Sequence, residues 1–178
     1  PPEPLPVSEA LPALTRPVAP PAMAAPVPPS QAMTEARALA DQATTLEALH
    51  AAIRDFNGCA LKKTAQRTVI CDGSPQARIM LIGEAPGAQE DQQGIPFCGP
   101  SGQLLDKMLA AIGLTRQDVY ITNTVFWRPP GNRNPTPEEL LICQPFVERH
   151  IALLAPKLIL LAGSVAVKAV LQREESIS

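Results

Sequence analysis

Apolar residues along this chain group into short runs separated by stretches with helical spacing. Three runs have the length and aliphatic content of buried strands: 78–82, 119–123 and 157–162. Helical patterns follow each of them, over 103–114, from Pro137 to about Leu154, and over 164–171. Strands that alternate with helices predict a parallel sheet covered on both faces, so the predicted fold class is α/β.

The first part of the chain has a different pattern. Residues 1–30 hold eleven of the 21 prolines, which favours extended, solvated backbone. We therefore expect a disordered linker over 1–33, which serves as a tether or as a Pro-rich site for a protein partner, and a folded domain over 34–178. A helical stripe within that domain consists of Leu46, Leu49, Ile53 and Phe56.

The longest loop between a predicted strand and a predicted helix is GEAPGAQEDQQGIPFCGPSG, residues 83–102. It carries Glu84 directly after the strand, then Glu90 and Phe97. Ligands of open α/β sheets bind at the carboxyl ends of the strands, where this loop begins and where Asn123 ends the next strand. The loop lacks the glycine spacing and the Lys-Ser/Thr pair of a phosphate-binding loop, which disfavours a nucleotide-phosphate site.

These residue types suit a nucleobase. An amide such as Asn123 offers a donor and an acceptor side by side to a base edge, while a ring such as Phe97 stacks on the base face. Each residue also has an ordinary alternative role, as a turn residue for Asn123, a core residue for Phe97 and a loop hydrogen-bond partner for Glu84. Arg128 and Arg133 suit phosphate contacts, although an exposed arginine pair is common.

Composition narrows the possibilities. A net charge of −2 and a pI near 5.7 give no overall attraction to nucleic acid, so DNA binding would need a local patch. The sequence has no run of about 18 apolar residues and no secretion signal, which predicts a cytoplasmic protein without a membrane partner. Four irregularly spaced cysteines do not predict disulfides.

Several motifs in order resemble the uracil-DNA glycosylase superfamily, in its iron–sulfur (family-four type) branch. They are GEAPGAQEDQQGIPFCGPSGQLLDKML, VYITNTVFWRPPGNRNPTPEE, CQPF and APKLILLAG. The resemblance extends from about Phe56 to Leu171. It implies a three-layer α/β/α fold around a short central parallel sheet, and hydrolysis of the N-glycosidic bond of uracil in DNA. We separately expect a monomer.

The resemblance also implies roles for individual residues. Glu84, Ala85 and Pro86 would line the uracil and water site, with Glu90 as a second acidic contact. Phe97 would stack on the flipped base and Asn123 would read its edge. The better-known branch has a water-activating Asp where this chain has Ala85, which leaves Glu84 or Glu90 for that task.

Two features depart from the family pattern. The 4Fe-4S cluster of the branch uses four cysteines, and this chain has Cys59 and Cys143 at two of those positions but Phe56 and Trp127 at the other two. We therefore expect no cluster, with the two rings filling its volume.

The family's late His motif is also absent before Ser178, and neither His50 nor His150 fits it, because both lie in predicted helices. We expect the last strand to be missing and turnover to be slow. The alternative function is a non-catalytic DNA or lesion-binding module tethered to replication or repair machinery.

Overall fold

The structure is a computed structural model that describes residues 28–172, so residues 1–27 of the expected linker and the tail 173–178 lie outside the described residues. Its helices are α1 (Pro29–Gln42), α2 (Leu46–Asp55), α3 (Ala88–Gln93), α4 (Pro100–Ala111), α5 (Pro137–Leu154) and α6 (Ser164–Leu171). Its strands are β1 (Cys71–Gly73), β2 (Ile79–Gly83), β3 (Val119–Asn123) and β4 (Leu158–Leu161). Three short 3-10 helices are η1 (Ala60–Lys63), η2 (Arg116–Asp118) and η3 (Pro130–Asn132).

The four strands form one sheet in the order β1-β3-β2-β4. The three predicted strands β2, β3 and β4 are parallel, but β1 pairs antiparallel with β3, so the sheet is mixed rather than purely parallel. Strand β1 is not among the three strands predicted from the sequence. That strand has only three residues, Cys-Asp-Gly, which carry no alternating apolar pattern; it forms because β3 offers a free edge.

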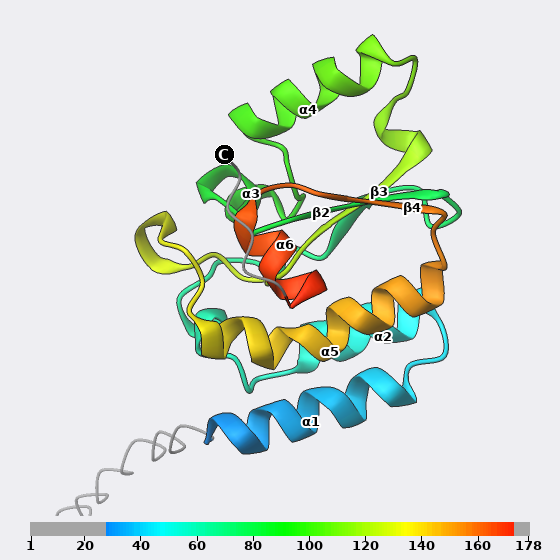
Figure 1. Cartoon of the computed structure of the whole chain (residues 1–178). Coiled ribbons are helices and arrows are strands. Elements are labelled where there is room, and N and C mark those ends of the chain that lie inside the picture. The colour runs from blue at the N-terminus through cyan, green and yellow to red at the C-terminus, as the bar shows by residue number, and fades with distance from the viewer. Residues whose placement is uncertain (1–27, 173–178) are drawn as a thin grey trace, which may run out of the picture.

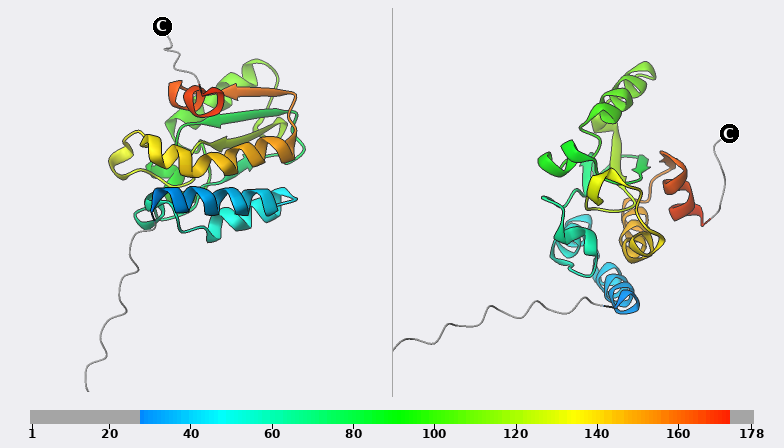
Figure 2. Two further views of the ribbon diagram at one scale, coloured as in Figure 1. Left: turned by 60° about the horizontal axis from the view of Figure 1, so that its bottom comes forward. Right: turned by 90° about the vertical axis from the view of Figure 1, so that its left-hand side faces the viewer.

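Helices cover both faces of the sheet, as Figures 1 and 2 show. Helices α2, α5 and α6 lie on one face, with α1 outside them against α5, and α4 lies on the other face. The larger core lies between the sheet and α2 and α5, and a smaller cluster lies under α4: Leu81, Leu105, Leu109, Val119 and Ile121. The predicted three-layer α/β/α fold is therefore confirmed.

The helix boundaries follow from local chemistry. Thr136 begins α5 with a capping box, in which the Glu139 backbone N–H donates to the Thr136 hydroxyl at 3.2 Å and the Thr136 N–H donates to the Glu139 carboxylate at 2.8 Å. Helix α1 begins at Pro29, five residues before the expected domain boundary at residue 34. It does so because three small buried residues, Ala32, Ala36 and Ala40, let it pack closely on its neighbours.

A histidine is buried in the larger core. The His150 side chain is fully buried, its Nδ1 donates to the Phe146 carbonyl at 2.9 Å, and its Nε2 has no partner among the described residues. The ring lies 5.4 Å from that of His50, whose Nε2 lies 2.8 Å from the Tyr120 hydroxyl. Burial lowers the pKa of His150 to about 3, because the hydrogen bond to the Phe146 carbonyl only partly offsets the cost of a buried imidazolium charge.

We expect acid to destabilise the fold through this histidine. The folded-state pKa lies below the ordinary 6.5, so the unfolded chain binds the extra proton and stability is lost as pH falls from 6.5 toward 3. Between pH 7 and pH 4 the loss amounts to about 3 kcal/mol at 1.36 kcal/mol per pH unit. Urea unfolding of wild type and His150→Phe at several pH values measures it. Equal pH slopes for the two proteins would contradict the prediction.

Candidate active site

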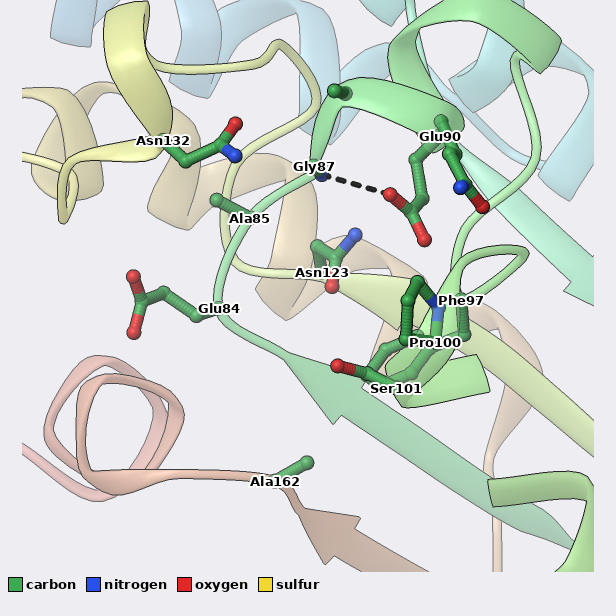
Figure 3. Close-up of a pocket in the computed structure, with 12 residues that line it drawn as sticks. Glu84, Ala85, Gly87, Glu90, Phe97, Pro100, Ser101, Asn123, Asn132 and Ala162 are labelled. Carbon is green, nitrogen blue, oxygen red and sulfur yellow. Dashed lines mark hydrogen bonds between the residues drawn. The ribbon is translucent and has the colours of Figure 1, made fainter. Parts of the chain in front are cut away.

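A pocket of about 570 Å³ opens at the carboxyl ends of β2, β3 and β4, within the size range of small-molecule sites (Figure 3). The chain after β2, with α3 and the first turn of α4, supplies most of its wall, and β3, η3 and the residue after β4 supply the rest. The lining residues are Glu84, Ala85, Gly87, Ala88, Gln89, Glu90, Phe97, Pro100, Ser101, Asn123, Asn132 and Ala162. The pocket thus brings together residues that are far apart in the sequence.

Gly83 allows the two central groups of the pocket to approach each other. In the parallel pairing of β2 and β3, Gly83 lies opposite Asn123. A Cβ atom at Gly83 would lie 2.5 Å from Cζ of Phe97 and 2.6 Å from Oδ1 of Asn123, closer than atoms can pack. Only glycine therefore lets the ring and the amide share this end of the sheet.

The Asn123 amide is available to a ligand. The residue is only 2% exposed, yet its side chain makes no hydrogen bond to another described residue. Its donor and its acceptor are presented at the pocket, where the strand fixes the backbone that carries them. A buried amide without a protein partner gains from a ligand that supplies both bonds.

Phe97 is half-buried rather than enclosed in the core. Its ring packs partly against the cluster under α4 and also lines the pocket. Its backbone has a φ of 53°, in the left-handed region that a phenylalanine seldom adopts. Gly102 of α4 packs closely against the Phe97 backbone. A Cβ atom added at Gly102 would lie 1.6 Å from the Phe97 carbonyl oxygen, so a larger residue does not fit there.

The two glutamates of the pocket differ in their partners. Both carboxylate oxygens of Glu90 accept backbone hydrogen bonds, one from Gly87 at 3.1 Å and the other from Gly99 at 2.8 Å, so Glu90 joins the two ends of its loop. The Glu84 carboxylate has no hydrogen-bond partner among the described residues, and in Figure 3 it points away from Glu90. Burial raises the pKa of Glu84.

The backbone of Glu84 is held firmly. Its carbonyl accepts a hydrogen bond from the Thr124 hydroxyl at 2.6 Å and another from the Thr124 backbone N–H at 3.2 Å. The chain leaving β2 is thereby tied to the chain leaving β3. Glu84 and Asn123 consequently have a fixed relative position, although they are 39 positions apart in the sequence.

Three residues that the sequence assigned to the site are placed outside the pocket lining. Pro86 is buried behind the loop. The Arg133 guanidinium pairs with both carboxylate oxygens of Glu139, at 2.9 and 2.7 Å, and Arg128 donates to Oδ1 of Asn132 at 2.6 Å. Contacts of these arginines with phosphate remain a prediction.

The sequence reading missed several lining residues. Asn132 lies at the pocket between the two arginines that were singled out, and Arg128 fixes its Oδ1, so the amide nitrogen is left free to donate. Ser101 belongs to the segment 83–102 that the sequence indicated, and it lies in the first turn of α4. Ala162 directly follows β4. Ala162 could have been predicted as a lining residue, because it follows the carboxyl end of a predicted strand, where ligands of such sheets bind.

The residues at the four positions where the family's cluster ligands would stand are buried in the apolar core. Phe56, Cys59, Trp127 and Cys143 are each at most 1% exposed. The Phe56 and Trp127 rings have centroids 6.4 Å apart, and the Trp127 indole donates to the Thr68 hydroxyl at 3.0 Å. The hydrogen bond with the Cys59 thiol and burial raise the pKa of Cys143 well above its ordinary value, while the same hydrogen bond lowers the pKa of Cys59, so the thiolate form that metals require is opposed at Cys143 alone.

These residues do not fit a four-cysteine iron–sulfur cluster. Two thiols face each other where four thiolates are needed, and bulky rings occupy the remaining space. Within residues 28–172, no three His, Cys, Asp or Glu side chains are grouped so that they could hold a metal ion. In the same part of the chain, no helix has both the length and the apolar character needed to cross a membrane.

The fold and the site define an α/β/α protein with a ligand pocket at the carboxyl ends of its parallel strands. A family model described as the uracil DNA glycosylase superfamily matches residues 71–177. The chain belongs to this superfamily.

Curated relatives agree with the family assignment. The chain is 41% identical over 127 residues to a type-4 uracil-DNA glycosylase of Pyrobaculum aerophilum, covering 71% of this chain and 65% of the relative. It is 44% identical to the type-4 enzyme of Archaeoglobus fulgidus, covering 68% and 62%, and 38% identical to a type-5 uracil-DNA glycosylase of Thermus thermophilus, covering 56% and 52%. The chain thus spans between about half and two thirds of the length of these relatives.

Proposed function

We propose that this protein hydrolyses the N-glycosidic bond between uracil and deoxyribose in DNA, as a base excision repair enzyme. The observation that carries the proposal is the convergence of a carboxylate, a half-buried ring and an amide, those of Glu84, Phe97 and Asn123, on one pocket, with neither polar group bonded to another described residue. The relatives named as uracil-DNA glycosylases support the substrate.

The pocket would take a base that has left the duplex. Extruding a nucleotide costs a few kcal/mol of unpairing and unstacking, and stacking on Phe97 restores part of it. The Asn123 amide would donate to O4 of uracil and accept from its N3–H. Cytosine presents the opposite pattern at that edge, an amine donor and a ring acceptor, and would leave the buried amide unpaired.

Glu84 is the better of the two candidates for activating water. Glu90 already accepts a backbone hydrogen bond at each oxygen, whereas the Glu84 carboxylate has no partner in the part of the chain that the structure describes, and burial raises its pKa. Water would attack C1′ as the bond from C1′ to N1 breaks, and uracil would leave with the bonding electrons. Glu84 would take a proton from the water, and the departing base would regain one.

Arg128 is the better placed of the two arginines for a DNA phosphate. Arg133 is committed to Glu139 through two short hydrogen bonds, whereas within residues 28–172 the Arg128 side chain hydrogen-bonds only to the neutral Asn132 amide. A guanidinium that holds a pocket residue and keeps nitrogens for phosphate would link backbone binding to the pocket.

An oligonucleotide assay tests the proposed function. The chain is incubated with a labelled strand that contains one uracil, and alkali then cleaves any abasic site. We expect scission at the uracil and none in a matched strand with thymine. If the chain binds the uracil strand without releasing base at any enzyme concentration, the alternative of a lesion-binding module replaces the enzyme; if it does neither, both functions fail.

We further propose that the protein holds no iron–sulfur cluster, because Phe56 and Trp127 fill the space beside Cys59 and Cys143. The purified protein should then contain less than about 0.1 iron per chain and be colourless, whereas a cluster ligated by four thiolates carries about four iron atoms. Anaerobic reconstitution with iron and sulfide should not change the wild type. Iron analysis and the absorbance near 400 nm measure the outcome.

A matched variant makes this prediction sharper. Restoring both cysteines in Phe56→Cys/Trp127→Cys should let reconstitution produce the brown colour, while either single change should not. A wild-type protein that takes up four iron atoms would contradict the proposal. A folded double variant that stays colourless would show that the surrounding core, rather than the two rings alone, excludes the cluster.

A further inference from the structure

Arg116 makes an unusually complete set of contacts behind the pocket. This residue begins η2, directly before β3, and its side chain is 21% exposed. Its Nη2 donates to the Pro96 carbonyl at 2.7 Å and its Nη1 to the Phe97 carbonyl at 3.0 Å. Two carboxylates also bind the guanidinium: Nε pairs with Asp72 at 2.7 Å and Nη1 pairs with Asp106 at 3.2 Å. All three guanidinium nitrogens therefore have a partner.

These contacts converge on Phe97, which with Asn132 is one of two non-glycine lining residues whose backbone lies in the left-handed region. A non-glycine residue in the left-handed region costs on the order of 1 to 3 kcal/mol, and it persists only where surrounding contacts hold it. The Phe97 carbonyl is held from two sides, by the Arg116 guanidinium and by the close approach of Gly102. Two carbonyls in succession, those of Pro96 and Phe97, are bound to a single rigid cation, so the backbone between them cannot rotate freely.

The guanidinium is itself anchored to the sheet. Asp72 belongs to β1, which pairs with β3, and Asp106 belongs to α4. Arg116 therefore connects the sheet, the helix and the loop through one side chain. The aspartates fix the plane of the guanidinium, and that plane directs the two remaining N–H groups at the loop carbonyls.

We propose that Arg116 is a positioning residue of the site, which holds the Phe97 ring where it stacks on the flipped base. This inference rests on the proposed function for its catalytic consequence, but the placement of the ring can be tested separately. Arg116 does not line the pocket itself, and its hydrogen bond to a lining residue is the one to the Phe97 carbonyl, so we expect its effect on a ligand to pass through Phe97.

The first experiment observes the ring directly. All four phenylalanines are replaced by 4-fluorophenylalanine, and the ¹⁹F resonance of residue 97 is assigned by its loss in Phe97→Leu. We expect Arg116→Ala to shift and broaden that resonance while the three core resonances stay in place, which also shows that the variant is folded. An unchanged resonance of residue 97 in a folded Arg116→Ala protein would overturn the proposal, whether or not the protein is a glycosylase.

The second experiment is a double-mutant cycle on release of uracil. Losing a base–aromatic stack lowers affinity about five- to a hundredfold, and we expect this change in kcat/KM for Phe97→Ala. Arg116→Ala should lower it by a similar factor, and the double variant should be no worse than Phe97→Ala alone. Factors that multiply would show that Arg116 acts independently of the ring and would overturn the proposal.

Two further variants separate positioning from general stability. Asp106→Asn removes one long, exposed ion pair and leaves both carbonyl bonds, so the resonance of residue 97 should stay in place. Arg116→Lys keeps the charge but cannot reproduce the fork to both carbonyls, so it should recover the thermal stability more fully than the position of the ring. If Lys restores both completely, charge alone suffices and the positioning role fails.

Discussion

Replacing Glu84 by glutamine is expected to lower kcat for uracil release by about 10²- to 10⁴-fold, the range that a positioned general base contributes. KM should change little, because glutamine has the same shape and the Glu84 side chain has no hydrogen bond to lose among the described residues. Single-turnover rates on a uracil-containing oligonucleotide measure the effect. Glu138→Gln, an exposed glutamate outside the pocket, is the matched control.

The pH dependence gives the same variant a second signature. Burial raises the pKa of Glu84 above the ordinary 4.5, and a base must be ionised to accept a proton. The wild-type rate should therefore fall as pH falls through that raised pKa, and this acid limb should be missing from Glu84→Gln. A retained limb in Glu84→Gln, or a rate within threefold of wild type, would contradict the assignment of Glu84 as the base.

Glu84→Gln should lower activity without lowering the stability of the fold. A carboxyl group whose pKa is raised by folding makes the fold less stable as pH rises through its unfolded and then its folded pKa, since the buried charge is unfavourable. Glu84→Gln should therefore melt at the same temperature as wild type at pH 7, or higher. This comparison shows that any loss of rate comes from chemistry and not from unfolding.

The position of the candidate pocket could be predicted from the sequence because two independent patterns pointed to it. The apolar run that ends at Gly83 and the run that ends at Asn123 each identify the carboxyl end of a strand, and parallel strands bring these ends to one edge. What the sequence left open was the choice between Glu84 and Glu90. That choice depends on which carboxylate the backbone of the loop has already bound, and no sequence spacing reveals this.

Other features were beyond a reading of local pattern. Strand β1 has no apolar alternation of its own and exists only through its pairing with β3. Arg116 contacts residues between 10 and 44 positions away, so nothing in its own neighbourhood marks it as important. A single charged residue between two predicted elements is usually solvated. Only the fold shows that all three guanidinium nitrogens of this arginine are hydrogen-bonded.

Replacing Asn123 by alanine is expected to lower kcat/KM for uracil by about 10²- to 10³-fold, the cost of removing a preorganised hydrogen-bonding group from a water-excluded site. The fold should be largely kept, since the amide is almost fully buried yet bonds to no other described side chain, so its loss strands no donor or acceptor of the protein. Thermal melting checks this. Asn134→Ala is the matched control, because Asn134 is exposed and engages Arg133 only through its backbone carbonyl.

The same variant tests whether Asn123 selects the base. Under the proposed role the wild-type amide would oppose cytosine, whose donor and acceptor at this edge are reversed, so both the preference for uracil and the rate would depend on it. In Asn123→Ala the rate on uracil should fall while that on cytosine stays near its own low value, and the ratio of the two should shrink. If the ratio stays unchanged while both rates fall together, Asn123 shapes the pocket without reading the base, and selection must reside in another lining group such as the Asn132 amide.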